Sequence, residues 1–227
     1  MDAAGVERAG VIAIEPFIGN EVVFAAARQH PARLVPIASV NPLAPLAAES
    51  VETLVVEHGA RAIKVHPRLQ RFGVEAAQQL IAVARQCGEQ RVPLVICSFQ
   101  GGPDLFRSQI LELCACVAEA AASADIVMAH AGGHRVMDAL LLSKAHRNIY
   151  LDLSFTPLYF KGSSVEQDFA YLMRKADRQR LLFGSDFPEV SIAESMATCT
   201  ASLESLRIPA SEIEAVLGLN AVRLLLR

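Results

Sequence analysis

The side chains that could do chemistry follow short apolar runs of the sequence. They are Lys64 and His66 in AIKVHP, Cys97 in PLVICSF, His130 in IVMAHAGG, Asp152 and Ser154 in YLDLS, and Asp186 in LLFGSDFP. Because side chains alternate between the two faces of a strand, residues two apart, such as Lys64 and His66, share one face. Imidazole, thiol and carboxylate groups bind divalent metals and transfer protons. The spacing therefore predicts a reactive cluster at one end of a sheet.

Each of these side chains also has a structural interpretation. A lone histidine such as His66 is more often a hydrogen-bonded structural residue than a metal ligand. Cys97 alone would be a small buried hydrophobe. Asp186, which precedes a Phe-Pro pair, could cap a following helix, and Asp152 between two leucines could simply accept hydrogen bonds. The residue types alone leave these alternatives open, so the elements that position them matter.

Short runs rich in Val, Ile, Leu or Phe alternate with amphipathic stretches along the whole chain. Such nearly continuous apolar runs are typical of strands buried on both faces, as in parallel sheets. The predicted strands are Gly10–Ile14, Leu34–Val40, Ala62–His66, Pro93–Cys97, Asp125–His130, Asn148–Ser154 and Arg180–Asp186. The predicted helices are Asn20–His30, Pro45–His58, Val74–Gln86, Leu105–Ala122, Arg135–Ala145, Ser164–Ala176, Val190–Leu203 and Ser211–Leu226. This alternation predicts a parallel sheet with helices outside it.

The repeat of strand and helix fits either a (β/α) barrel or an open doubly wound sheet. An open sheet that binds a dinucleotide carries GxGxxG after its first strand, whereas here that segment reads EPFIG. We therefore expect one α/β domain over residues 1–227, folded as a TIM-type (β/α) barrel. A complete barrel has eight units in ~250 residues, and about seven strands are recognisable in these 227 residues. The first strand of the barrel is expected to be missing.

The composition excludes several classes of protein. The formal net charge is −3, with 21 basic and 24 acidic residues well mixed and no tryptophan, so we expect no nucleic-acid binding. No apolar run approaches the ~20 residues of a membrane span, and no signal peptide is recognisable. Five cysteines without a CxxC pair are typical of reduced thiols. These features predict a cytoplasmic protein without a membrane partner.

Several segments together resemble a known family. They are Gly5–Ala9 (GVERA), Ala62–Pro67 (AIKVHP), His130–Gly133 (HAGG), Tyr150–Ser154 (YLDLS), Gly184–Pro188 (GSDFP) and Leu217–Leu224 (LGLNAVRL). In order and spacing the sequence resembles the amidohydrolase-related (amidohydrolase 2) metal-dependent hydrolases, whose superfamily branch includes decarboxylases of aromatic acids and lactone hydrolases. The resemblance implies a barrel that holds one divalent metal, commonly zinc. It also implies that Asp186 binds the metal or activates its water, and that His130 is a general acid/base.

The sequence departs from this family pattern at two positions. The family's first strand ends in a His-x-His pair that supplies two metal ligands, and the chain contains no His-x-His. The family also has a metal-binding histidine at the end of its fifth strand, where this chain has Cys97. A thiolate can bind zinc. The resemblance therefore leaves Asp186, His66 and Cys97 as the expected metal ligands.

The function implied by the resemblance is hydrolysis of an amide, ester or lactone bond in a small organic acid. A metal lowers the pKa of bound water from ~15.7 towards ~7, which makes hydroxide available at neutral pH. Asp186 would accept a proton from this water, and His130 would protonate or stabilise the oxyanion. Lys64 and Ser154 are the expected substrate-binding residues. The alternatives are a non-oxidative decarboxylase of the same family, or a crippled or truncated barrel without metal.

A barrel that lacks one strand has two open sheet edges. Open edges invite pairing with another chain. We therefore expect either that other residues cover the gap or that the chain forms a homo-oligomer.

Overall fold

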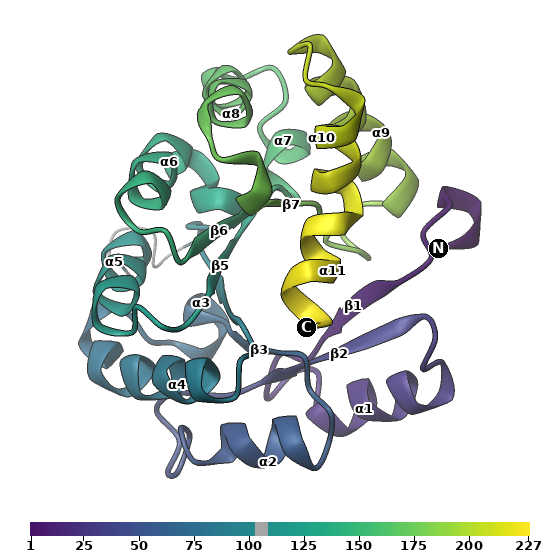
Figure 1. The fold of residues 1–227 in the computed structure, drawn as a ribbon. Helices are drawn as coiled ribbons and strands as arrows, with labels where there is room; N and C mark the ends of the chain where they lie inside the picture. The colour runs from purple at the N-terminus through teal and green to yellow at the C-terminus, as the bar shows by residue number, and fades with distance from the viewer. Residues whose placement is uncertain (103–108) are drawn as a thin grey trace.

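The computed structural model describes residues 1–102 and 109–227. In these residues seven parallel strands form one sheet, and each strand pairs with the next one along the chain. The strands are β1 (Ala9–Ile12), β2 (Leu34–Ser39), β3 (Ala62–Val65), β4 (Leu94–Cys97), β5 (Ile126–Ala129), β6 (Ile149–Asp152) and β7 (Leu181–Leu182). Figure 1 shows the sheet curling around the centre of the molecule. This curled half-barrel confirms the predicted (β/α) barrel class.

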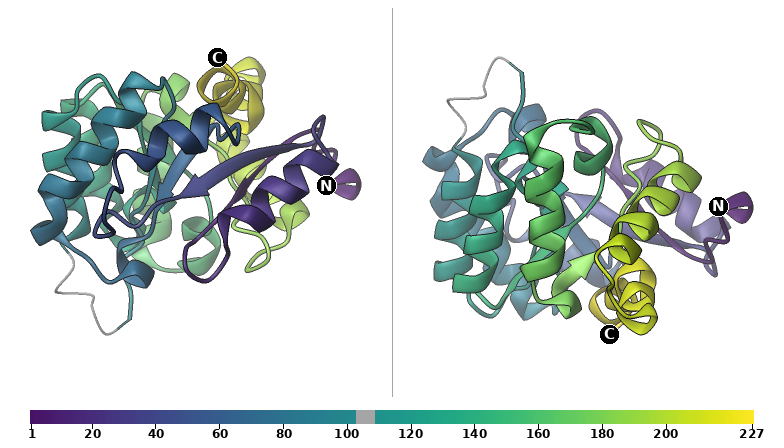
Figure 2. Two further views of the ribbon diagram at one scale, coloured as in Figure 1. Left: turned by 90° about the horizontal axis from the view of Figure 1, so that it is seen from below. Right: turned by 90° about the horizontal axis from the view of Figure 1, so that it is seen from above.

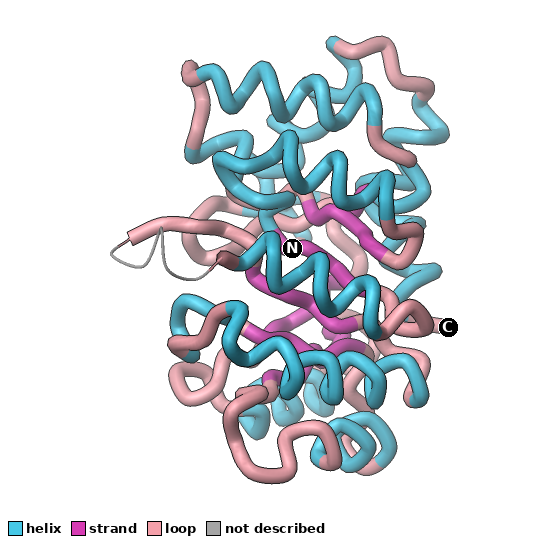
Figure 3. Tube along the Cα trace, turned by 90° about the vertical axis from the view of Figure 1, so that its left-hand side faces the viewer, coloured by secondary structure: helices cyan, strands magenta, loops and turns pink. Residues whose placement is uncertain are grey.

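Helices surround the curled sheet, as Figures 2 and 3 show from other directions. They are α1 (Asn20–Gln29), α2 (Ser50–Val56), α3 (Pro67–Gln70), α4 (Ala77–Glu89), α5 (Ile110–Ala120), α6 (Val136–Ala145), α7 (Thr156–Tyr159), α8 (Ser164–Lys175), α9 (Ile192–Ser205), α10 (Ala210–Glu214) and α11 (Asn220–Leu225). The helix predicted for Leu105–Ala122 corresponds to α5, and positions 105–108 of that prediction lie outside the described residues. Among the helices described, none is long and apolar enough to cross a membrane.

The buried apolar side chains form two clusters, one on each face of the sheet. The larger cluster packs the sheet against the outer helices and includes Ile63, Ile96 and Phe169. The smaller cluster lies inside the curl and consists of Ile37, Ala62, Val95, Val127, Ala129, Leu182 and Leu224, with Tyr150, Ala221 and Leu225 against it. Neighbouring residues of one strand, such as Ala62 and Ile63, belong to different clusters, as expected for a strand buried on both faces.

The C-terminal helix differs from the continuous one predicted over Ser211–Leu226. After α10 a π-helical turn over Ala215–Leu219 separates it from α11. The side-chain amide of Asn220 donates to the carbonyls of Arg178 and Leu181, both at 2.7 Å, and ties the start of α11 to β7. From there α11 directs Leu224 into the inner cluster. This helix therefore covers the open side of the half-barrel next to β7 (Figure 1).

The last strand is shorter than the predicted Arg180–Asp186. Only Leu181 and Leu182 pair with β6, because the next backbone N–H, that of Phe183, donates to the carbonyl of Val216 at 3.0 Å. The chain thus leaves the sheet after Leu182. Asp186 lies beyond the strand, in the left-handed backbone region with φ 60°. Its position is set by a loop and not by the pleat of the sheet.

Candidate functional site

The candidate site lies inside the curl, at the carboxyl ends of the strands. Lys64, Cys97 and Asp152 each follow, two residues later, a side chain that lines the inner cluster. Those preceding side chains are Ala62, Val95 and Tyr150. Because alternate side chains point to the same face of a strand, the lysine, the thiol and the carboxylate enter the same interior. β3 and β4 pair in parallel with Lys64 opposite Val95. The carboxyl ends of these two strands therefore lie at the same edge of the sheet.

Cys97 is the centre of this group and contacts two histidines. The thiol is buried, with 2% of the residue exposed, and it receives hydrogen bonds from His130 and His66. Burial raises the pKa of Cys97, but the charge of His130, these two hydrogen bonds and the charge of Lys64 lower it more. The result is a pKa well below the usual range of a thiol. The charge of His130 and the two hydrogen bonds therefore favour the thiolate form of Cys97.

His130 is held from its other side by a short chain of hydrogen bonds. The hydroxyl of Ser154 lies 3.0 Å from Nδ1 of His130 and donates to Oδ1 of Asp152. The same carboxylate oxygen accepts the backbone N–H of Ser154 at 3.0 Å. Burial lowers the pKa of His130, but the charge and hydrogen bond of Cys97 raise it more, so this pKa lies above its ordinary value. The protonated form of the ring is thus favoured, and the Ser154 contact fixes its orientation.

The backbone around His130 has an unusual conformation. From His130 to Gly133 every residue has a positive φ, between 44° and 82°. The hydroxyl of Ser98 stabilises this turn, since it donates to the carbonyl of Ala129 at 2.6 Å and accepts from the backbone N–H of Gly132 at 2.8 Å. Thr156 adds a bond from its hydroxyl to the carbonyl of His130 at 2.7 Å. Sequence reasoning missed Ser98 and Thr156, because their roles depend on a turn from another strand.

His66 begins α3 and caps it with its own ring. Nδ1 of His66 accepts the backbone N–H of Leu69 at 3.3 Å, so Nε2 is the ring nitrogen left to donate to Cys97. Gln70, one turn later, accepts the backbone N–H of His66 at 2.7 Å and donates to the carbonyl of Val40 at 3.1 Å. From the sequence, Gln70 was not identified as part of the site. The available signal was its position four residues after His66, in a helix that starts with proline.

Asp186 stands at the edge of the group and is partly exposed. Burial raises the pKa of its carboxyl, the charge of His130 lowers it, and Asp152 raises it again, with a net increase. Near Asp186, Gly184 approaches the site closely, since a Cβ there would lie 2.6 Å from Oδ2 of Asp152. A glycine is therefore required where the loop after β7 passes Asp152.

Aromatic rings form a wall beside His130. The rings of Phe99 and Phe155 each lie edge-on to the imidazole, with centroids 6.0 Å away. The ring of Tyr159 is tilted against Phe155 at 5.0 Å and edge-on to Phe99 at 5.4 Å, both measured between ring centroids. These rings form an apolar aromatic cluster at one side of the imidazole. The site therefore combines charged groups with an aromatic cluster.

The structure brings only some of the predicted site residues into contact with one another. His66, Cys97, His130 and Ser154 form one connected group, Lys64 acts on it through its charge, and Asp186 remains peripheral. The described residues contain no group of three or more His, Cys, Asp or Glu side chains placed to hold a metal ion. A catalytic zinc site needs three protein ligands and an open position. As arranged, these donors do not fit the expected metal, and the ligand roles of Asp186, His66 and Cys97 stay predictions.

A family model named Amidohydro_2 and described as Amidohydrolase matches residues 1–227. The chain belongs to this family, which confirms the resemblance found in the sequence. A comparison with curated proteins gives no match.

Solved structures share the fold along nearly the whole chain. An uncharacterized TIM-barrel protein from Bordetella bronchiseptica has 22% identity and a TM-score of 0.84, with 100% of this chain and 80% of that one covered. A probable 2-pyrone-4,6-dicarboxylic acid hydrolase from Acinetobacter baumannii, with citric acid bound, has 16% identity and a TM-score of 0.69, covering 100% and 86%. A 5-carboxyvanillate decarboxylase from Novosphingobium aromaticivorans, complexed with manganese, has 14% identity and a TM-score of 0.68, covering 100% and 78%. At these identities the likeness establishes the fold alone.

Proposed function

We propose that the protein is a hydrolase that cleaves an ester, amide or lactone bond in a small planar organic acid. The observation that supports this most strongly is the position of His130 between the Cys97 thiolate and the Ser154–Asp152 pair. This arrangement supplies a protonated, oriented imidazole inside the curl. Such a group can protonate an oxygen that develops negative charge.

The acid and the base of the reaction follow from the two pKa shifts. The raised pKa of Asp186 makes its carboxylate a stronger base than an ordinary aspartate. The raised pKa of His130 favours its protonated form, which can donate a proton. Asp186 accepts a proton from the attacking water as the water oxygen bonds to the acyl carbon. His130 then gives its proton to the leaving oxygen or nitrogen, and the acyl bond to that atom breaks.

Substrate recognition rests on one cation and the aromatic wall. Lys64 is buried, with 4% of the residue exposed, and its ammonium is available to pair with a carboxylate of the substrate. Phe99, Phe155 and Tyr159 offer rings against which a planar substrate can stack. Ser154, expected from the sequence to bind substrate, is better suited to positioning His130 because its hydroxyl already contacts both His130 and Asp152.

No step of this mechanism runs through a metal, because no group of three or more donors in the described residues is placed to hold one. Cys97 occupies the position where the family has a metal-binding histidine. Its thiolate has another use here, since a negative charge beside His130 keeps that ring protonated. Cys97 is thus a positioning residue in this proposal.

The reaction can be tested with 2-pyrone-4,6-dicarboxylate, the lactone in the name of the Acinetobacter neighbour. The full chain is incubated with this lactone while acid release is followed in a pH-stat and carbon dioxide by mass spectrometry. Ring opening by water converts the lactone into a carboxylate and releases about one proton per turnover. Release of carbon dioxide without ring opening would contradict the hydrolase and favour the decarboxylase.

A further inference from the structure

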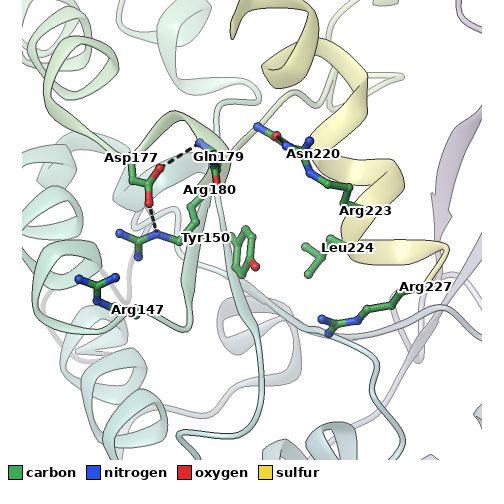
Figure 4. Close-up of a pocket in the computed structure, with 9 residues that line it drawn as sticks. All are labelled: Arg147, Tyr150, Asp177, Gln179, Arg180, Asn220, Arg223, Leu224 and Arg227. Carbon is green, nitrogen blue, oxygen red and sulfur yellow. Dashed lines mark hydrogen bonds and ion pairs between the residues drawn. The ribbon is translucent and has the colours of Figure 1, made fainter.

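A cavity of about 290 Å³ opens at the amino ends of β6 and β7, the opposite end of the sheet from His130. Tyr150 of β6 and Leu224 of α11 lie across it from one another, and arginine side chains surround them (Figure 4). One wall belongs to the loops that enter β6 and β7, and the other belongs to α11. The fold of the C-terminal segment therefore creates this cavity.

Four arginines line the cavity: Arg147, Arg180, Arg223 and Arg227. Arg180 pairs with Asp177 at 3.2 Å, and Arg227 pairs with Asp125 at 2.6 Å. In the described ranges, 1–102 and 109–227, neither Arg147 nor Arg223 has an ion pair with a carboxylate. Two positive charges around the cavity are thus not compensated by the protein.

Two of these guanidinium groups are held in place before any ligand binds. One terminal nitrogen of Arg180 donates to the carbonyls of Ser143 at 2.8 Å and Ile149 at 3.0 Å. Arg223 donates to the side-chain carbonyl of Asn220, which is itself buried and tied to β7. A preorganised group loses less conformational entropy on binding. Each of the two walls of the cavity therefore carries one guanidinium group that the protein itself holds in place.

We propose that this cavity binds a small anion with two negative charges, either a dicarboxylate or a phosphate. The planar guanidinium fork matches the geometry of both groups. The volume is close to the lower limit of small-molecule pockets, ~300 Å³. Leu224 offers an apolar surface for a short carbon chain. The Tyr150 hydroxyl remains a proton donor, because burial and the charge of Asp125 raise its pKa.

The ligand would join α11 to the entrance of β6 and β7, so binding should stabilise the folded chain. We would measure binding of succinate, inorganic phosphate and acetate to the full chain by calorimetry at low salt, together with the melting temperature. At least one of the two dianions is expected to bind with a dissociation constant of about 1 mM or lower and to raise the melting temperature. Acetate should bind at least about tenfold more weakly, because it carries one charge. Preference for succinate or for phosphate identifies the source of the dianion.

Arg147→Gln is the informative variant, because the guanidinium of Arg147 lies outside the ion pairs of the described residues. It should weaken binding of the dianion by about tenfold, the loss of one charged donor, while the unliganded melting temperature stays unchanged. Arg28→Gln, on the exposed surface of α1, is the matched control and should bind normally. The proposal is overturned if neither dianion saturates by about 10 mM, or if Arg28→Gln weakens binding as much as Arg147→Gln does.

Discussion

The hydroxyl of Ser154 lies 3.0 Å from Nδ1 of His130 and also contacts the carboxylate of Asp152. Ser154, two residues beyond the end of β6 at Asp152, thus connects that aspartate to His130, which directly follows β5. The connection fixes the plane of the imidazole and supports its protonated form. Orientation of a proton donor affects catalysis more than substrate binding.

Ser154→Ala should therefore lower kcat by about tenfold to a hundredfold, within the range of general acid–base catalysis, and change KM little. Steady-state kinetics with the lactone would measure both constants. Ser205→Ala, at an exposed position near the end of α9, serves as the control and should leave both unchanged. An equal loss in the two variants, or a change in KM alone, would contradict the positioning role of Ser154.

Cys97→Ala should shift the pH dependence of activity. The charge and hydrogen bond of Cys97 raise the pKa of His130, so removal of the thiol lowers it. His130 acts in its protonated form, and the alkaline limb of the pH–rate profile should therefore move to lower pH. An unchanged alkaline limb in the active variant would show that Cys97 does not control His130.

The same pair makes a prediction for stability. The lowered pKa of Cys97 contributes stability that is present above the unfolded pKa of about 8.5 and is lost as pH falls through the folded pKa. The raised pKa of His130 contributes stability below about 6.5 that is lost as pH rises through the folded pKa. We would measure the free energy of unfolding of wild type and Cys97→Ala by denaturant unfolding at a series of pH values. The difference between the two proteins should be smaller at acidic and at alkaline pH than near neutral pH. A difference that is constant across the series would contradict the charged pair.

Asp186→Asn should affect activity and stability in opposite directions. Loss of the base should lower kcat by at least about a hundredfold. The pKa of Asp186 is raised, so its ionised form costs stability above the unfolded pKa of about 3.9, and the variant should melt at a slightly higher temperature near neutral pH. In acid, where the carboxyl is protonated in both states, the gain should disappear. A lower melting temperature together with unchanged turnover would contradict both assignments.

Metal analysis tests the donor arrangement directly. Because the described residues contain no group of three or more His, Cys, Asp or Glu side chains placed to hold a metal ion, zinc reconstitution followed by desalting should leave less than about 0.1 equivalent bound. Elemental analysis of wild type and His66→Ala would measure this. One full equivalent in wild type that disappears in His66→Ala would show that the donors do assemble around a metal, as the sequence predicted.

The sequence was sufficient to predict the sheet and most of its reactive ends. Buried parallel strands such as β4 and β5 consist of continuous apolar runs, and the first polar residue after each run marks the strand end. Lys64 and Cys97 could be placed on the inner face because the pleat has a period of two. Asp186 could not be placed in this way, since its chain leaves the sheet after Leu182 to bond with Val216.

Other features depend on contacts between distant parts of the chain. The contacts of Cys97 with two histidines require the carboxyl ends of three strands to lie at the same edge of the sheet. The role of Ser98 depends on a left-handed turn at Gly132 that only the folded neighbour reveals. The arginine-lined cavity requires α11 to fold back over the strand ends, where Arg227 reaches Asp125, 102 positions earlier. No local pattern of residues carries that information.

The most direct test of the proposed hydrolase compares His130→Ala with His134→Ala in the lactone assay. His134 is exposed in the same turn, whereas His130 is the proton donor of the mechanism. His130→Ala should lose about a hundredfold to ten-thousandfold in turnover, while His134→Ala retains activity close to wild type and releases acid without carbon dioxide. Equal turnover in His130→Ala and wild type would contradict the mechanism.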